Sequence, residues 1–176
     1  QAVLVEAFTS RDLSRVKRTL LDHLDRIADG RAPISDFVMS GKVKLGSYAK
    51  DRDAARAAAS GVAPVRKAHY PPAAVVADRA MRRDPRAKPV YKERVPYVVV
   101  FGESTRLVDL VVDPFEVVSH ELATLESRRA VPKINVKYYI TKLVLPALDR
   151  LLCVFGVDVF SWARALVVSG GSKVAL

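Results

Sequence analysis

The chain has 176 residues, of which 50% are hydrophobic and 7% aromatic, so it is long enough for one domain with an aliphatic core. Its 29 Lys and Arg against 19 Asp and Glu give a net charge of +10. This excess favours a polyanion, first nucleic acid and second an anionic membrane, over an acidic protein or a small metabolite. The sequence has neither a long apolar run nor a signal-peptide pattern, which predicts a soluble intracellular protein without a membrane partner.

An amphipathic helix is predicted from Asp12 to Ala28, because apolar residues recur there every three or four positions. Ser10 or Asp12 is available as the N-cap and Gly30 as the stop. The carboxylates at 22, 25 and 29 have arginines nearby and are interpreted as a solvated face, not as a magnesium site. The same interpretation applies to Asp51 and Asp53.

The segment from Pro33 to Leu45 predicts a short turn that leads into an extended stretch. Lys42 and Lys44 alternate with apolar residues and are expected on its exposed side. The run 51–61 is rich in Ala and Arg and is interpreted as a solvated helical insertion without chemistry.

A second helix is predicted to open at Pro71 and Pro72, since a first-turn proline forfeits no hydrogen bond. A basic cluster occupies its far end: Arg79, Arg82 and Arg83. On a chain of net charge +10, this cluster is a candidate for phosphate contact.

Two apolar runs of β type follow, from Arg94 to Gly102 and from Leu107 to Val112, with GESTR between them as a hairpin turn. They predict two paired strands. A short helix is expected after Asp113, and the charged stretch 119–130 is assigned no function.

The clearest helix pattern lies between Lys133 and Trp162, with Asn135 as N-cap, a bend at Pro146 and Gly156 as a left-handed C-cap. One buried stripe is predicted along it: Ile140, Leu143, Ala147, Leu148, Leu151, Leu152 and Phe155. The only cysteine, Cys153, is interpreted as a buried thiol that forms neither a disulfide nor a zinc site.

The first turn of this helix is both basic and aromatic, with Lys133, Asn135, Lys137 and Tyr138 near the positive end of the helix dipole. This turn is a candidate phosphate grip, and an ordinary solvated helix start is the alternative. The sequence contains no Gly-rich phosphate loop, no G-x-S-x-G motif and no histidine pair at ligand spacing. We therefore predict no catalytic residue and no metal site in this chain.

The blocks N-V-K-Y-Y-I-T-K, L-P-A-L-D-R and G-V-D-V-F-S-W resemble the end of the thumb domain of family B DNA polymerases, and the last is most similar to the zeta branch. Four further blocks follow the family's order: S-R-D-L-S-R-V-K at 10–17, I-S-D-F-V at 34–38, A-V-V-A-D-R-A-M-R-R at 74–83 and E-R-V-P-Y-V-V-V-F-G at 93–102. The resemblance covers almost the whole chain.

This resemblance implies part of a nuclear DNA-directed DNA polymerase, a nucleotidyltransferase of translesion synthesis and DNA repair, whose thumb grips the primer-template duplex. It implies a palm edge and linking helix at 1–37 and the thumb domain at 38–166. After Trp162 the chain departs from the family's pattern, and 167–176 are expected to form a disordered tail. The family's Y-G-D-T-D block is absent, so the fragment alone is not expected to be active and holds no cofactor. For the parent enzyme the resemblance implies Mg²⁺, allows an iron–sulfur cluster, and implies other polymerase subunits bound through a C-terminal region not present here.

The predicted fold class is α+β, a mostly helical thumb with a small β-hairpin or sheet. The candidate DNA-binding residues are Lys42, Lys44, Arg79, Arg82, Arg83, Arg94, Lys133, Asn135, Lys137 and Tyr138. Three alternatives stay open: the thumb of another family B polymerase such as delta, a non-enzymatic basic module that binds nucleic acid, and a purely structural interaction domain.

Overall fold

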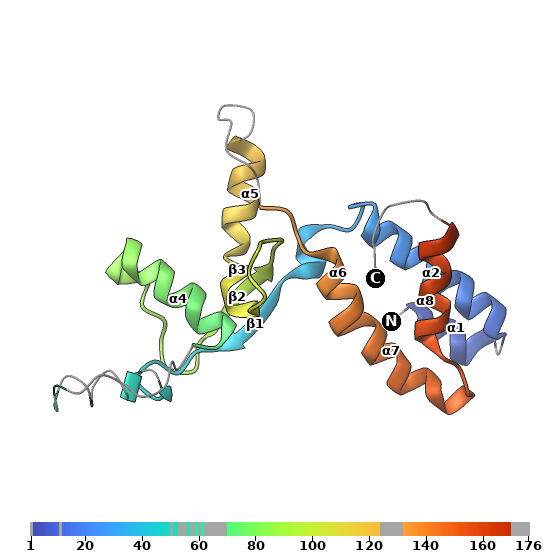
Figure 1. Cartoon of the computed structure of the whole chain (residues 1–176), viewed down its shortest axis with the longest axis horizontal. Helices are drawn as coiled ribbons and strands as arrows, with labels where there is room; N and C mark the ends of the chain where they lie inside the picture. The colour runs from blue at the N-terminus through green and yellow to red at the C-terminus, as the bar shows by residue number, and fades with distance from the viewer. Residues whose placement is uncertain are drawn as a thin grey trace. The chain divides into compact units, whose positions relative to one another are not determined.

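The computed structural model describes residues 2–10, 12–49, 51–52, 56, 59, 61, 70–123 and 132–169. The chain divides into two compact units (Figure 1). Unit 1 comprises Gln1–Asp36 and Asn135–Leu176, and unit 2 comprises Phe37–Ile134. The described part of the chain contains no helix with the length and apolarity that a membrane span needs.

Unit 1 is helical. Its elements are α1 (Ala2–Ser10), α2 (Leu13–Ala28), α6 (Val136–Tyr138), the π-helical η4 (Tyr139–Val144), α7 (Leu145–Leu152), η5 (Cys153–Phe155) and α8 (Val159–Ser169). Asp12 caps α2 as predicted, because its side chain accepts a hydrogen bond of 2.8 Å from the Ser14 N–H. Val16, Leu20 and Leu24 of α2 are buried in the core of this unit.

The helix that starts after Asn135 begins and ends as predicted. The Asn135 side chain accepts a hydrogen bond of 3.0 Å from the Tyr138 N–H, and Gly156 follows the last turn with a φ of 68°. The middle differs, because the Leu145 N–H bonds to the Ile140 carbonyl five residues back. This π turn places Pro146 in the first turn of α7, where a missing N–H costs no hydrogen bond.

The π turn also corrects the predicted buried stripe. A turn with one extra residue rotates the following residues by about 100° relative to a regular helix of 3.6 residues per turn. Ile140, Leu145 and Leu152 are therefore buried, in steps of five and seven residues. Several residues predicted to be buried are exposed instead: Leu143, Ala147, Leu151, Cys153 and Phe155.

Unit 2 is built on an antiparallel sheet of three strands in the order β1 (Met39–Lys42), β2 (Arg94–Val99) and β3 (Val111–Val112). The helices α4 (Pro72–Arg83) and α5 (Pro114–Ala123) pack against these strands (Figure 1). Unit 2 also contains the short 3₁₀ helices η2 (Pro85–Ala87) and η3 (Leu107–Asp109), and η1 (Ile34–Phe37), most of which is assigned to unit 1, leads into β1. The α+β fold class and the proline-opened helix are confirmed.

The second predicted strand is shorter than expected. Only Val111 and Val112 pair with β2, whereas Leu107–Asp109 form a 3₁₀ turn. The carboxylate of Asp109 bonds to the Ser104 hydroxyl at 2.7 Å and to the Arg106 guanidinium at 2.8 Å. These local bonds compete with strand pairing, so the hairpin widens into a longer connection.

Helix α4 approaches β1 closely because residue 41 is a glycine. A Cβ atom placed at Gly41 would lie 2.9 Å from the Cβ of Ala73, closer than two such atoms normally come. Ala73, Ala74 and Ala77 pack beside Val43 in the core under this contact. Small residues on both elements therefore fix α4 against the strand that carries Lys42.

The two units are compact parts of the chain and are not defined as palm or thumb, so the predicted palm and thumb boundaries stay a prediction. The division at residue 36 lies beside the predicted boundary at 37, while the predicted thumb, 38–166, includes parts of both units. Helix α8 extends to Ser169, and 170–176 of the predicted tail lie outside the described residues. Most of the stretches 51–61 and 119–130 also lie outside them.

Candidate nucleic-acid interface

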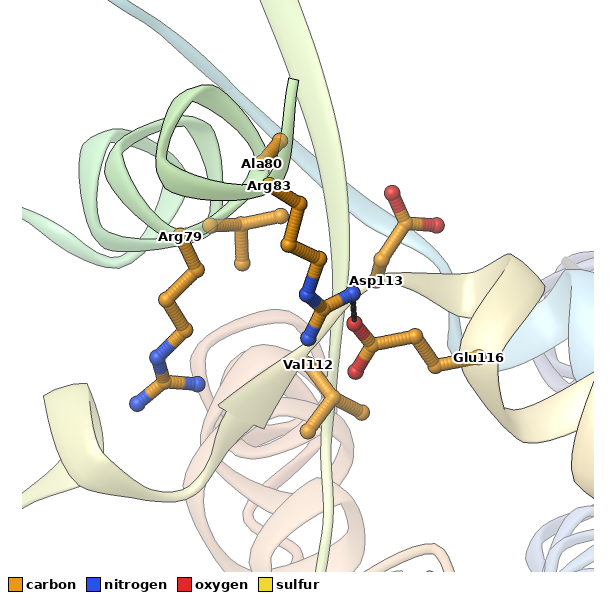
Figure 2. Close-up of a pocket in the computed structure, with 7 residues that line it drawn as sticks. Arg79, Ala80, Arg83, Val112, Asp113 and Glu116 are labelled. Atoms are coloured by element: carbon orange, nitrogen blue, oxygen red, sulfur yellow. Dashed lines mark hydrogen bonds and ion pairs between the residues drawn. The ribbon is translucent and has the colours of Figure 1, made fainter. Parts of the chain in front are cut away.

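Two of the three predicted arginines of α4 make contacts inside unit 2. Figure 2 shows the contact of Arg83 with Glu116. The Arg79 guanidinium donates a hydrogen bond to the Val111 carbonyl, and Arg83 forms an ion pair with Glu116 of α5. Together with Val112 they line a small pocket between α4, β3 and α5. Arg79 and Arg83 therefore connect α4 to the neighbouring elements, and a phosphate would compete with acceptors of the protein.

The third arginine, Arg82, lies on another part of the helix surface. Its guanidinium is 2.8 Å from the carboxylate of Asp78, one turn earlier, and its side chain is largely exposed. Such exposed ion pairs contribute little free energy, so Arg82 is free to exchange this partner for another anion.

A second basic group lies where β1 ends and the antiparallel strand β2 begins. Lys42 stands directly opposite Arg94 in the antiparallel register. Like charges in this arrangement destabilise a strand pair. The Arg94 guanidinium bonds instead to Ser40, at 3.0 Å to the hydroxyl and 3.3 Å to the carbonyl. In the described part of the chain, the side-chain bonds of Arg94 thus go to a hydroxyl and a carbonyl and not to a carboxylate.

Pairing continues beyond the last strand residues and brings in a cation that was not predicted. The Val43 N–H bonds to the Glu93 carbonyl, and the Lys92 N–H bonds to the Val43 carbonyl, both at 2.8 Å. Lys92 therefore lies beside the extended segment of Lys42 and Lys44. The sequence places Lys92 two residues before Arg94, which could have drawn attention to it. Only the pairing of the strands shows that Lys92 lies opposite Val43.

We call Lys42, Lys44, Lys92 and Arg94 the strand-end cations. All four side chains are exposed. Within the described part of the chain, none of them forms an ion pair with a carboxylate. This group of uncompensated charges distinguishes the end of the β1–β2 pair from the arginines of α4.

The turn that carries Lys44 is held by hydrogen bonds to the side chains of Tyr48 and Asp51. The Lys44 N–H donates to the Tyr48 hydroxyl at 2.8 Å, and the Gly46 N–H donates to a carboxylate oxygen of Asp51 at 2.7 Å. The Tyr70 hydroxyl donates to the other oxygen of Asp51. Asp51 was predicted to be merely solvated, and this is wrong, because it joins the turn to the start of α4.

The contact between Tyr70 and Asp51 changes the acidity of the phenol. Donation of its proton to the Asp51 carboxylate, then partial burial and the negative charge of Asp51, raise the pKa of Tyr70 to about 12. The Tyr48 ring packs edge-on against the Tyr70 ring, with centroids 5.6 Å apart. The phenol is therefore neutral, and a hydrogen-bond donor, throughout the physiological range.

Lys133 lies at the other end of β2. Its carbonyl accepts a hydrogen bond of 2.8 Å from the Phe101 N–H, and Ile134 forms a bridge with Val100. Phe101 follows Arg94 by seven residues of mostly extended chain, which corresponds to roughly 20 Å. The structure therefore does not bring Lys133 together with the strand-end cations.

The remaining candidates, Asn135, Lys137 and Tyr138, belong to unit 1 and form a group of their own. The Asn135 side chain is engaged as the N-cap, and the Tyr138 ring lies edge-on to Tyr139 at 5.7 Å. Lys137 is exposed. Contact of these residues with DNA stays a prediction.

Metal ligands are not clustered in the described part of the chain. No group of three or more His, Cys, Asp or Glu side chains lies close enough there to hold an ion. The described site is therefore one of cations, hydroxyls and backbone, which suits contact with phosphate groups.

A scan against protein-family models finds no match. The chain is 37% identical over 156 residues, 88% of its length, to the DNA polymerase zeta catalytic subunit of Arabidopsis thaliana, of which it covers 7%. It is 34% identical over 163 residues, 92% of its length, to that of Saccharomyces cerevisiae, covering 9%. For Homo sapiens the identity is 32% over 160 residues, 90% of the chain and 4% of the relative.

These matches span nearly the whole chain but less than a tenth of the length of the curated relatives. They confirm the resemblance that the sequence blocks indicated, including its zeta branch. Over about nine-tenths of its length, the chain is similar to one segment of the DNA polymerase zeta catalytic subunits.

Proposed function

We propose that the chain is the thumb, with the adjoining palm edge, of a zeta-like DNA-directed DNA polymerase, and that it holds the primer-template duplex through its phosphates. The observation that carries this proposal is the group of strand-end cations, in which Lys42 faces Arg94 and, among the described residues, neither forms an ion pair with a carboxylate. A polyanion supplies the missing negative charge. Phosphates are the same in every sequence, so the grip is independent of base sequence.

The contribution of this segment to polymerisation is positional. Cations that bind the DNA backbone slow dissociation between nucleotide additions without taking part in bond formation. The relatives' names support a role within a DNA polymerase. We propose that this polymerase acts in the nucleus in translesion synthesis and repair. We expect the Mg²⁺ ions of the parent enzyme to be held by carboxylates elsewhere in it, and its other subunits to bind outside this segment.

The proposal is tested by binding of the chain to a fluorescent duplex over a range of salt concentrations. Log affinity for a duplex falls with log salt by about 0.9 per phosphate contact. A variant with Lys42→Ala, Lys44→Ala and Arg94→Ala should lower the magnitude of this slope by about 2 to 3 and weaken binding equally on different sequences.

A matched control removes three cations that already have carboxylate partners, by Arg15→Ala, Arg31→Ala and Arg106→Ala. The two variants have the same net charge, so any difference between them comes from the position of the cations. The control should keep a slope close to that of the parent chain. Equal slopes for the two variants would contradict the proposal that the strand-end cations form the grip.

A further inference from the structure

The turn Val90–Glu93 lies directly before the first strand-end residue of β2 and is firmly held. The Glu93 N–H bonds to the Val90 carbonyl at 2.9 Å, and the Glu93 carboxylate accepts a hydrogen bond from the Val90 N–H at 2.6 Å. The Lys92 N–H bonds across to Val43. The turn is thus closed on itself and attached to the neighbouring strand.

One residue of this turn has an unusual backbone. Lys92 has a φ of 67°, and among the described residues it is the only one other than glycine with a positive φ. This left-handed backbone conformation is unfavourable for residues that have a Cβ atom. Glycine or asparagine is usual at such a turn position. A lysine here keeps its ammonium group at a small cost in conformational energy, which points to a use for that group.

The tip of the turn exposes apolar surface between cations. Val90 is 75% exposed and Tyr91 is 62% exposed. The Lys92 ammonium lies 5.3 Å from the centroid of the Tyr91 ring. A ring presented in this way beside the Lys92 ammonium suits a partner that offers both negative charge and a flat apolar face.

We propose that the Val90–Glu93 turn binds an unpaired nucleotide, with the base stacked on Tyr91 and the adjacent phosphate near Lys92. In a duplex the bases are paired and their faces are covered by their neighbours, whereas an unpaired base can leave the stack and present a face to an aromatic side chain. The turn thus contacts DNA where pairing ends, whereas the strand-end cations contact phosphates in general. This inference rests on the proposed DNA grip and adds a second kind of contact to it.

The test compares a blunt duplex with the same duplex carrying a short single-stranded overhang. Tyr91→Ala should lower affinity for the overhang DNA about tenfold and leave the blunt duplex unchanged, because stacking of one base is lost. The salt slope should stay constant, since no phosphate contact is removed. Tyr91→Phe keeps the ring and should keep the affinity.

Phe115→Ala is the control, because Phe115 is also in unit 2 and is 75% exposed but lies on α5. It should affect neither DNA. Equal losses on both DNAs with Tyr91→Ala, or no loss on the overhang DNA, would overturn the inference. If the strand-end variant alters the salt slope while Tyr91→Ala has no effect, the stacking site fails and the grip stands. If the strand-end variant matches its control, the grip itself fails.

Discussion

Two basic regions of unit 2 use similar side chains for different purposes. At the corner of α4, β3 and α5, Arg79 and Arg83 bond to a carbonyl and a carboxylate of the chain. At the end of β1 and β2, Lys42 and Arg94 face each other with no carboxylate partner in the described residues. The first arrangement holds elements of the unit together, and the second leaves charge available for a partner.

The difference lies in what surrounds the charges and not in their number. Arginine donates several hydrogen bonds in fixed directions, which suits the Val111 carbonyl of β3 and the Glu116 carboxylate of α5 as acceptors. The strand end adds two lysines at positions 42 and 44, on alternate residues of an extended chain, and both are exposed. A polyanion can approach these lysines without displacing a carboxylate partner among the described residues.

Gly41→Val tests whether both regions depend on the same support. The added side chain would meet Ala73 and push α4 away from β1, because a Cβ atom at residue 41 would already lie 2.9 Å from the Cβ of Ala73. We expect a loss of roughly 1–3 kcal/mol in the free energy of unfolding, as for other overpacked contacts. Chemical denaturation measures it, with Lys42→Val on the exposed face as a control of small effect. A change within about 0.5 kcal/mol would show that the close approach is not needed.

Several parts of this arrangement could be read from the sequence. The alternation around Val43 predicted that Lys42 and Lys44 would be exposed, and paired prolines predicted the start of α4. These are local properties of a strand and of a helix terminus. The partners of Arg79 and Arg83 come from residues more than thirty positions away, and no local pattern shows them.

The long helix of unit 1 shows a second limit of prediction from sequence. A regular period was assumed through Tyr139–Val144, where the chain forms a π turn. One inserted residue changes the face of everything that follows, so Leu145 is buried and Leu151 is exposed. Pro146 was a signal for irregularity, but a kink and a π turn are both compatible with it.

Arg79→Ala sharpens the contrast between the two regions at the α4 corner. Removal of the guanidinium leaves the Val111 carbonyl without this donor, and we expect a loss of about 1 kcal/mol in the free energy of unfolding. Arg82→Ala, which removes only an exposed ion pair, should cost less than about 0.5 kcal/mol. Urea denaturation measures both. The salt slope of DNA binding with Arg79→Ala should stay that of the parent chain, and a decrease by about 0.9 would assign Arg79 to the grip after all.

The smallest expected effect is the pH dependence of the hydrogen bond between Tyr70 and Asp51, the residue that also holds the Lys44 turn. The hydrogen bond to Asp51 raises the pKa of Tyr70 to about 12, whereas an unfolded tyrosine has a pKa near 10. The folded state therefore favours the neutral phenol. Its contribution to stability is complete below about pH 10 and is lost as the pH rises through about 12.

Absorbance titration of the phenolate measures this directly, because Tyr70→Phe should remove one ionisation near pH 12 and leave the others in place. Asp51→Ala should move that ionisation back toward pH 10, since both the acceptor and its charge are lost. Glu103→Ala removes the same charge from another exposed position of unit 2 and should not move it. If Asp51→Ala left the ionisation near 12, Asp51 would not be the acceptor that joins the Lys44 turn to α4, and the strand-end lysines would lack the support described for them.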